Sequence, residues 1–109
     1  MADLGDLIEL IVDVPEHNLR AGSRGAIVHQ HTPEAYEVEI ANESGETEDL
    51  LPLRAEQFIV VWRSETHERV PLAEQVSELM NRLPEESGRE VLDFARFLAL
   101  RRRIGLSRA

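Results

Sequence analysis

Three histidines are the residues in this sequence best suited to bind a metal. His29 and His31 lie two apart in an apolar segment, so they share one face if that segment is a strand. His17 is nearby in the sequence. A transition-metal site needs a further ligand at a characteristic spacing, and the sequence offers neither that spacing nor any cysteine. We therefore expect solvent-facing histidines, with no bound metal and no other cofactor.

Glu37 and Glu39 are the candidates for a pair of catalytic carboxylates. They also share one strand face, and more acidic residues follow at 43–49. A catalytic carboxylate needs an apolar or charge-perturbed pocket. The strands described below predict a small β-barrel, and a barrel of about 60 residues fills its interior with its own side chains. The sequence has no nucleophile elbow and no phosphate-binding loop. We therefore expect a solvated acidic face and a protein that is not an enzyme.

Charge is distributed unevenly along the 109 residues. Residues 1–63 carry four arginines against 13 acidic residues, a net charge of −9, whereas residues 64–109 are neutral, with eight of each. A nucleic-acid-binding surface is normally basic, so binding of nucleic acid by the first part is disfavoured. A basic protein partner, or solubility alone, explains the acidic excess.

Short apolar segments separated by glycine and proline predict five strands in the first half of the chain. Tyr36, Val38 and Ile40 alternate with Glu37 and Glu39, which is the period of a half-buried strand. A sharp glycine turn is expected at residues 22–25, and Trp62 is expected in the core. The five strands are predicted at residues 7–12, 26–31, 35–40, 46–51 and 57–62.

The period of the apolar residues changes from 2 to 3.6 after a polar segment. Residues 64–71 are predicted to be a linker, and a first helix is predicted from Leu72 to Leu83, where Pro84 ends it. A second helix begins at Pro84 and is expected to stop at Gly105. The predicted fold class is α+β, with a small five-stranded SH3-like β-barrel at 1–63 and a helical hairpin with a basic tail at 72–109.

The second helix carries more apolar residues than one helical neighbour can cover. Val91, Phe94, Ala95 and Leu98 form the stripe expected to pack in the core. Leu92, Phe97 and Leu100 widen the apolar surface beyond that stripe, and Arg101 follows them. Exposed apolar surface of this kind marks an interface, although packing against the barrel explains it equally well. The predicted partner-binding residues are Leu92, Phe97, Leu100 and Arg101, together with Glu37 and Glu39 on the acidic face.

Two resemblances add to this interpretation. Residues 7–62 resemble a bacterial family of unknown function with an SH3-like barrel, on the residues Asp13-Val14-Pro15-Glu16, Leu19, Gly22-x-x-Gly25-x-Ile27-Val28, Tyr36-Glu37-Val38-Glu39-Ile40, Gly45-x-Thr47 and Leu53. Residues 72–101 resemble a short antitoxin-associated helical family, on Leu83-Pro84-Glu85-Glu86 and Glu90-Val91-Leu92-Asp93-Phe94-x-x-Phe97-Leu98. Members of the second family are described as antitoxin-like and are encoded beside ribonuclease toxins of the PIN-domain type. The resemblance implies a small regulatory protein and supplies no catalytic residues.

Three functions are compatible with these observations. The first is an antitoxin-like protein that binds and masks a neighbouring toxin-like protein. The second is a nucleic-acid-binding SH3-like module, and the third is an accessory subunit or assembly chaperone of a larger enzyme. A homodimer through the C-terminal helices is a further expectation. No apolar run approaches the ~20 residues of a membrane span, and the acidic N-terminus predicts a cytoplasmic protein.

Overall fold

The fold is described by a computed structural model, which covers residues 2–107 and gives side chains up to residue 102. It divides into two compact units, residues 1–75 and 76–109. The first contains a six-stranded antiparallel sheet and the second contains most of two helices. The elements are β1 (Leu7–Leu10), β2 (Arg24–Thr32), β3 (Ala35–Ala41), β4 (Thr47–Arg54), β5 (Phe58–Arg63), β6 (Glu68–Arg69), α1 (Leu72–Met80) and α2 (Glu85–Ser107), with 3-10 turns η1 (Pro15–His17) and η2 (Ala55–Gln57).

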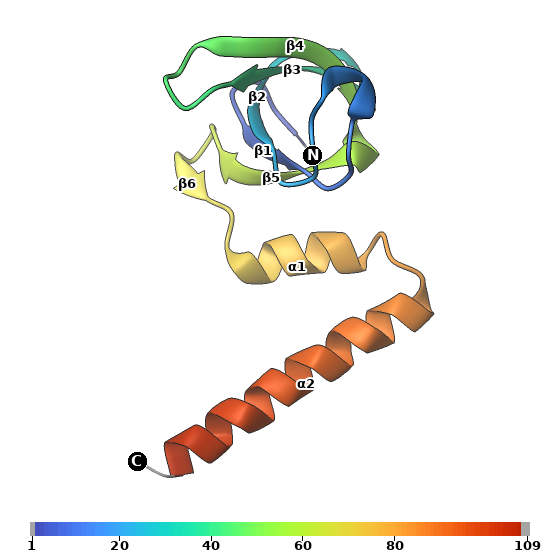
Figure 1. The fold of residues 1–109 in the computed structure, drawn as a ribbon, viewed down its shortest axis with the longest axis vertical. Helices are drawn as coiled ribbons and strands as arrows, with labels where there is room; N and C mark the ends of the chain where they lie inside the picture. The colour runs from blue at the N-terminus through green and yellow to red at the C-terminus, as the bar shows by residue number, and fades with distance from the viewer. Residues whose placement is uncertain (1, 108–109) are drawn as a thin grey trace. The chain divides into compact units, whose positions relative to one another are not determined.

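The sheet has the strand order β4-β3-β2-β1-β5-β6. It bends strongly, so that β4 and β5 lie on opposite sides of the space it encloses (Figure 1). Among the described residues, β4 and β6 remain its two edges, so the sheet is open. The α+β class is therefore confirmed, while the predicted closed barrel is replaced by a curved open sheet. All five predicted strands are present, with ends shifted by a few residues.

The sixth strand lies inside the segment predicted to be a linker. Residues 68 and 69 pair with Arg63 and Trp62 of β5, and the contact boundary between the two units falls later, between Gln75 and Val76. The polar sequence of 64–71 has no strand period, so only its pairing with β5 identifies it as part of the sheet.

One face of the sheet forms the core. Tyr36, Val38 and Ile40 are buried, and Glu37 and Glu39 point to the other face, which confirms the predicted alternation. The Tyr36 ring packs edge-on against Phe58 at a centroid distance of 5.6 Å, and its hydroxyl donates to the Pro33 carbonyl at 3.1 Å. The other core side chains are Ile8, Leu10, Val14, Ile27, Leu51 and Leu53, with Ala2 at the rim. Trp62 is only half-buried and is absent from this cluster, so its predicted place in the core is wrong.

The two glycines of the predicted turn have different roles. Gly22 has a φ of +97°, a left-handed conformation that glycine adopts at little cost. Gly25 lies inside β2, where a Cβ would come within 2.7 Å of the Glu39 carbonyl oxygen and 2.8 Å of Val38 Cγ1. Gly25 is therefore required by the close approach of β3, because any side chain would push the two strands apart.

A buried aspartate joins the N-terminus to the end of β5. Asp6 is 1% exposed, and its carboxylate accepts the backbone N–H of Ser64 at 2.9 Å and that of Asp3 at 2.9 Å. Ser64 Oγ lies 3.0 Å from the same carboxylate. A buried carboxylate is tolerated when such donors replace its water, and this link connects residues 58 positions apart.

Neither helix has a buried residue between positions 71 and 102. α1 ends at Met80, and α2 begins at Glu85 directly after Pro84, close to the predicted boundaries. α2 continues through Gly105 to Ser107, so the predicted stop at Gly105 is wrong; a single glycine inside a helix costs about 1 kcal/mol and is tolerated. Neither described helix has the length and apolar character needed to cross a bilayer.

We predict that Asp6→Ala lowers the free energy of unfolding by about 2 kcal/mol, because hydrogen bonds to a buried charged group contribute about 1.5–3 kcal/mol. Urea denaturation followed by the fluorescence of Trp62, the only tryptophan, measures this change. Glu43→Ala in the exposed hairpin turn is the control and should have little effect. An Asp6 variant as stable as the parent would contradict the structural role of this carboxylate.

Gly25→Ala should also destabilise the sheet unit, by about 1–3 kcal/mol, since overpacking forces backbone shifts of this cost. The matched control is Ala26→Gly at the next position of the same strand, which removes a side chain and creates no clash. Thermal unfolding by circular dichroism compares the two variants. A Gly25→Ala protein with an unchanged midpoint would show that β2 and β3 separate at no cost.

Candidate functional site

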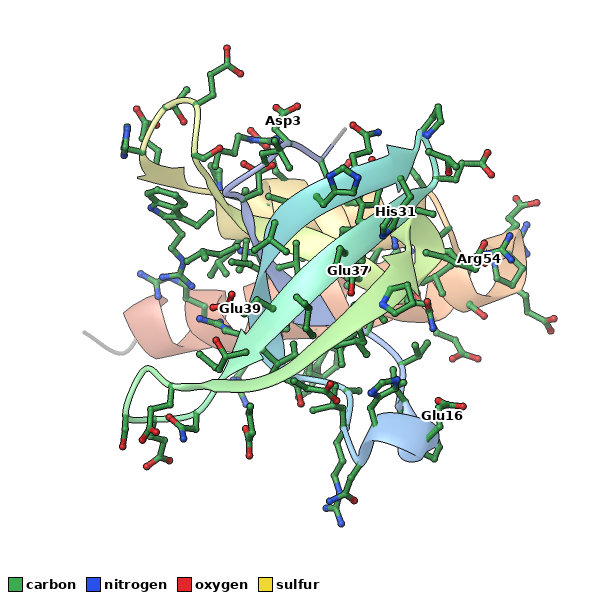
Figure 2. All side chains as sticks on the ribbon, turned by 90° about the horizontal axis from the view of Figure 1, so that it is seen from above. Asp3, Glu16, His31, Glu37, Glu39 and Arg54 are labelled. Atoms are coloured by element: carbon green, nitrogen blue, oxygen red, sulfur yellow. The ribbon has the colours of Figure 1, made fainter. Side chains whose placement is uncertain are left out.

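The outer face of β3 carries the two glutamates predicted to contact a partner. Glu37 and Glu39 both point away from the core, and His31 lies beside Glu37 (Figure 2). His31 Nε2 is 2.7 Å from Glu37 Oε1, and the His29 and His31 rings meet at a centroid distance of 4.8 Å. His29 and His31 therefore share the outer face, as the sequence predicts.

The third histidine lies elsewhere on the sheet unit. His17, at the end of η1, places Nδ1 2.7 Å from Asp49 Oδ2 on β4. The hydrogen bond from His17 lowers the pKa of Asp49, opposed by desolvation and assisted by the Leu50 backbone N–H and by the charge of His17. Among the described residues no group of three or more histidine, aspartate or glutamate side chains could hold a metal ion.

A row of paired residues crosses the outer face. Glu39 pairs with Ala26, Ala26 with Leu7, Leu7 with Trp62 and Trp62 with Arg69. Directly paired residues of antiparallel strands point to the same face, so these five side chains come from five different strands and share one surface.

The row lines a hollow of about 440 Å³, which is within the usual range of a ligand pocket. The small residues of the middle strands leave this space open. The Trp62 ring and the Leu7 side chain, both partly exposed, form its apolar side. Arg24 and Arg69 are the cations at the hollow, and Glu39 is the anion. Arg24 is also bound to Glu9, at 3.2 Å.

Glu37 and Glu39 thus lie in two different surroundings. Glu37 contacts His31, whereas Glu39 lies at the hollow with the two arginines. Both side chains remain partly exposed.

The predicted residues on α2 are all exposed. Leu92, Phe97 and Leu100 retain 46%, 54% and 59% of their accessible surface. Arg101 lies over the Phe97 ring at 5.7 Å from its centroid, an attraction between a cation and a ring face. These four residues all belong to α2 of the helical unit.

The sequence interpretation missed two sets of residues. Phe94 was assigned to the core stripe, yet it is 61% exposed and stacks on Phe97 at 6.2 Å. The outer row with Leu7 and Trp62 was not identified either. Alternation in β1, which buries Ile8 and exposes Leu7, was the available signal, but the row itself needs the register of the strands.

We predict that His17→Ala raises the pKa of Asp49 toward its ordinary value, because the main hydrogen bond that lowers it is removed. An aspartate with a lowered pKa stabilises the fold at pH values above its unfolded pKa, and this contribution is lost as the pH falls through the folded pKa. Carbon-detected NMR titration of the Asp49 carboxyl measures the shift. His31→Ala, which removes the contact with Glu37, should leave Asp49 unchanged, and an unchanged pKa in His17→Ala would contradict the assignment.

The sheet unit matches a family model described as a domain of unknown function, DUF4926, over residues 4–60. This agrees with the family of unknown function expected over residues 7–62, and the match ends before β6 and both helices. No curated protein and no solved structure has significant similarity to the chain. Because the match covers 57 of the 109 residues, the chain belongs to the DUF4926 family.

Proposed function

We propose that the chain is a non-enzymatic protein-binding module whose contact residues are Leu92, Phe97, Leu100 and Arg101 of α2. The observation that carries the proposal is the absence of any buried side chain between residues 71 and 102, in a segment rich in leucine and phenylalanine. Large apolar side chains left in water mark interfaces, and aromatic residues and arginine are the types that contribute most to binding.

The partner that fits best has an apolar groove next to a basic surface. An amphipathic helix binds such a groove through residues spaced three and four apart. The net charge of −9 on residues 1–63, with Glu37 and Glu39 on the outer face, complements a basic surface and speeds association. Masking of a neighbouring toxin-like nuclease is the specific form of this proposal, because a nuclease needs a basic surface to bind its substrate.

The curvature of the sheet supports an SH3-like assignment for this unit within the proposal. SH3-like folds serve as protein-binding, RNA-binding and accessory modules, so the fold alone does not select among them. Binding of nucleic acid is disfavoured by the acidic charge of the sheet unit. The accessory-subunit function remains the alternative, and it differs in having an enzyme rather than a toxin as partner.

The test is binding to a purified partner. A tagged protein captures partners from its native host in parallel with and without nuclease, and the captured protein is then produced alone and titrated by calorimetry. We expect a one-to-one complex that Phe97→Asp/Leu100→Asp weakens at least about 30-fold, the effect of losing roughly 2 kcal/mol at binding hot spots. Leu72→Asp, which places the same charge on an exposed leucine of α1, is the matched control.

Two results would reject the proposal. Equal affinity of the double variant and the parent would show that α2 is not the contact. Loss of every captured protein on nuclease treatment would favour nucleic-acid binding instead. The activity of the purified partner, with and without this chain, then separates masking from service as a subunit.

A further inference from the structure

A second apolar stripe on α2 adjoins the proposed partner contact at Phe97, which stacks on Phe94 of the stripe. Val91, Phe94 and Leu98 are spaced three and four residues apart and therefore follow one side of the helix. Leu100 lies on the other side of the helix from this stripe, by the turn of about 100° per residue. Phe94 is the most exposed residue of the stripe, at 61%.

The helix needs a covering surface along this stripe. Isolated helices are marginal in water, and most helical stability in proteins comes from packing of an apolar side. α1 approaches α2 at the start of α2, where a Cβ on Gly88 would lie 3.5 Å from Met80 Cε. Phe94, nearly two turns further along, keeps most of its surface.

The charges of α2 are divided between its two halves. Residues 85–95 contain four acidic residues and one arginine, a net charge of −3. Residues 96–102 contain three arginines and no acidic residue, a net charge of +3. The sign changes between Asp93 and Arg96, beside Phe94. At about 100° per residue, Glu90, Arg101 and Arg102 border the stripe. The bordering charge is therefore acidic before Phe94 and basic after it, which is complementary to a reversed copy of the helix.

We propose that the Val91, Phe94 and Leu98 stripe binds the same stripe of a second copy, with the two α2 helices antiparallel. An isologous pair of this kind places each acidic half against a basic half, whereas a parallel pair would place like charges together. The two-fold axis then passes near Phe94, so the two copies of this ring are close to one another. The part of α2 from residue 85 to residue 102 is about 27 Å long at 1.5 Å per residue. This length is sufficient for a contact between two helices.

The inference uses the same helix as the proposed function, and its stripe adjoins that contact because Phe94 stacks on Phe97. Leu100 lies outside the stripe, so a variant at Leu100 separates the failure of one proposal from the failure of the other. A dimer presents two copies of Leu100 on its outer surface, and a bivalent module binds a dimeric or repeated partner more tightly than a monomer does.

Mass measurement by light scattering tests the dimer. The mass of the parent protein is measured from 1 to 100 µM at low salt, roughly the range that separates specific from weak association. With increasing concentration this mass should approach twice the monomer mass of 12.4 kDa. Phe94→Glu, which places two carboxylates near the two-fold axis, should be monomeric. Leu100→Asp is the matched control, since its leucine is as exposed as Phe94, and this variant should remain dimeric while losing the partner protein.

Charge exchange tests the orientation. A first variant replaces the three arginines of the basic half, and it should raise the dissociation constant at least about tenfold, because both halves become acidic. A second variant also replaces three acidic residues of the other half, so that opposite charges meet again and dimerisation should return. The first variant is Arg96→Glu/Arg101→Glu/Arg102→Glu, and the second adds Glu85→Arg/Glu86→Arg/Glu90→Arg.

Each outcome decides the inference. A monomeric parent at 100 µM overturns it, and protection of α2 amides from hydrogen exchange in that monomer would show that α2 packs against its own chain. A first charge variant that dimerises like the parent overturns the antiparallel arrangement. Trp62 fluorescence and far-ultraviolet circular dichroism confirm that each variant is folded. The second charge variant is a further control, because dimerisation returns in it only if the first variant lost the dimer through charge and not through unfolding.

Discussion

Burial of one face of the curved sheet is the constraint on which the rest of the structure depends. Tyr36, Val38 and Ile40 are removed from water on β3, and the alternation of a strand then sends Glu37 and Glu39 to the outer face. Burial of apolar surface is the dominant favourable contribution to folding. The position of Glu37 and Glu39 on the outer face is therefore a consequence of the core.

The ends of the sheet are held by contacts distant in sequence. Asp6 accepts hydrogen bonds from Ser64 after β5, and β6 pairs with Trp62 and Arg63. At the opposite edge, β4 accommodates Pro52, which an edge strand tolerates because one side of its backbone needs no strand partner. These contacts position β1, β5 and β6 beside one another and thereby form the outer hollow with Arg24, Arg69 and Glu39.

The helical unit follows a different principle. It has no buried side chain in its described part, so its apolar residues form no core within the unit. Two adjoining surfaces of α2 have different roles in our proposals: the one with Phe97 and Leu100 for a partner protein, and the one with Phe94 for a second copy. The DUF4926 match covers residues 4–60 of the sheet unit, so the proposed contacts on α2 lie outside the matched residues.

The sequence by itself determined the strands, the helices and the two-faced pattern of β3, because these depend on local spacing of apolar residues and on turns at glycine and proline. It also predicts that Leu92, Phe97 and Leu100 contact a partner; the structure shows all three exposed, and the contact itself stays a prediction. Only the tertiary structure decided that Trp62 lies outside the core, that residues 68–69 form a strand, and that Gly25 is needed against β3. Each of these depends on strand register or on distances between segments far apart in the chain, and local spacing contains no information about either.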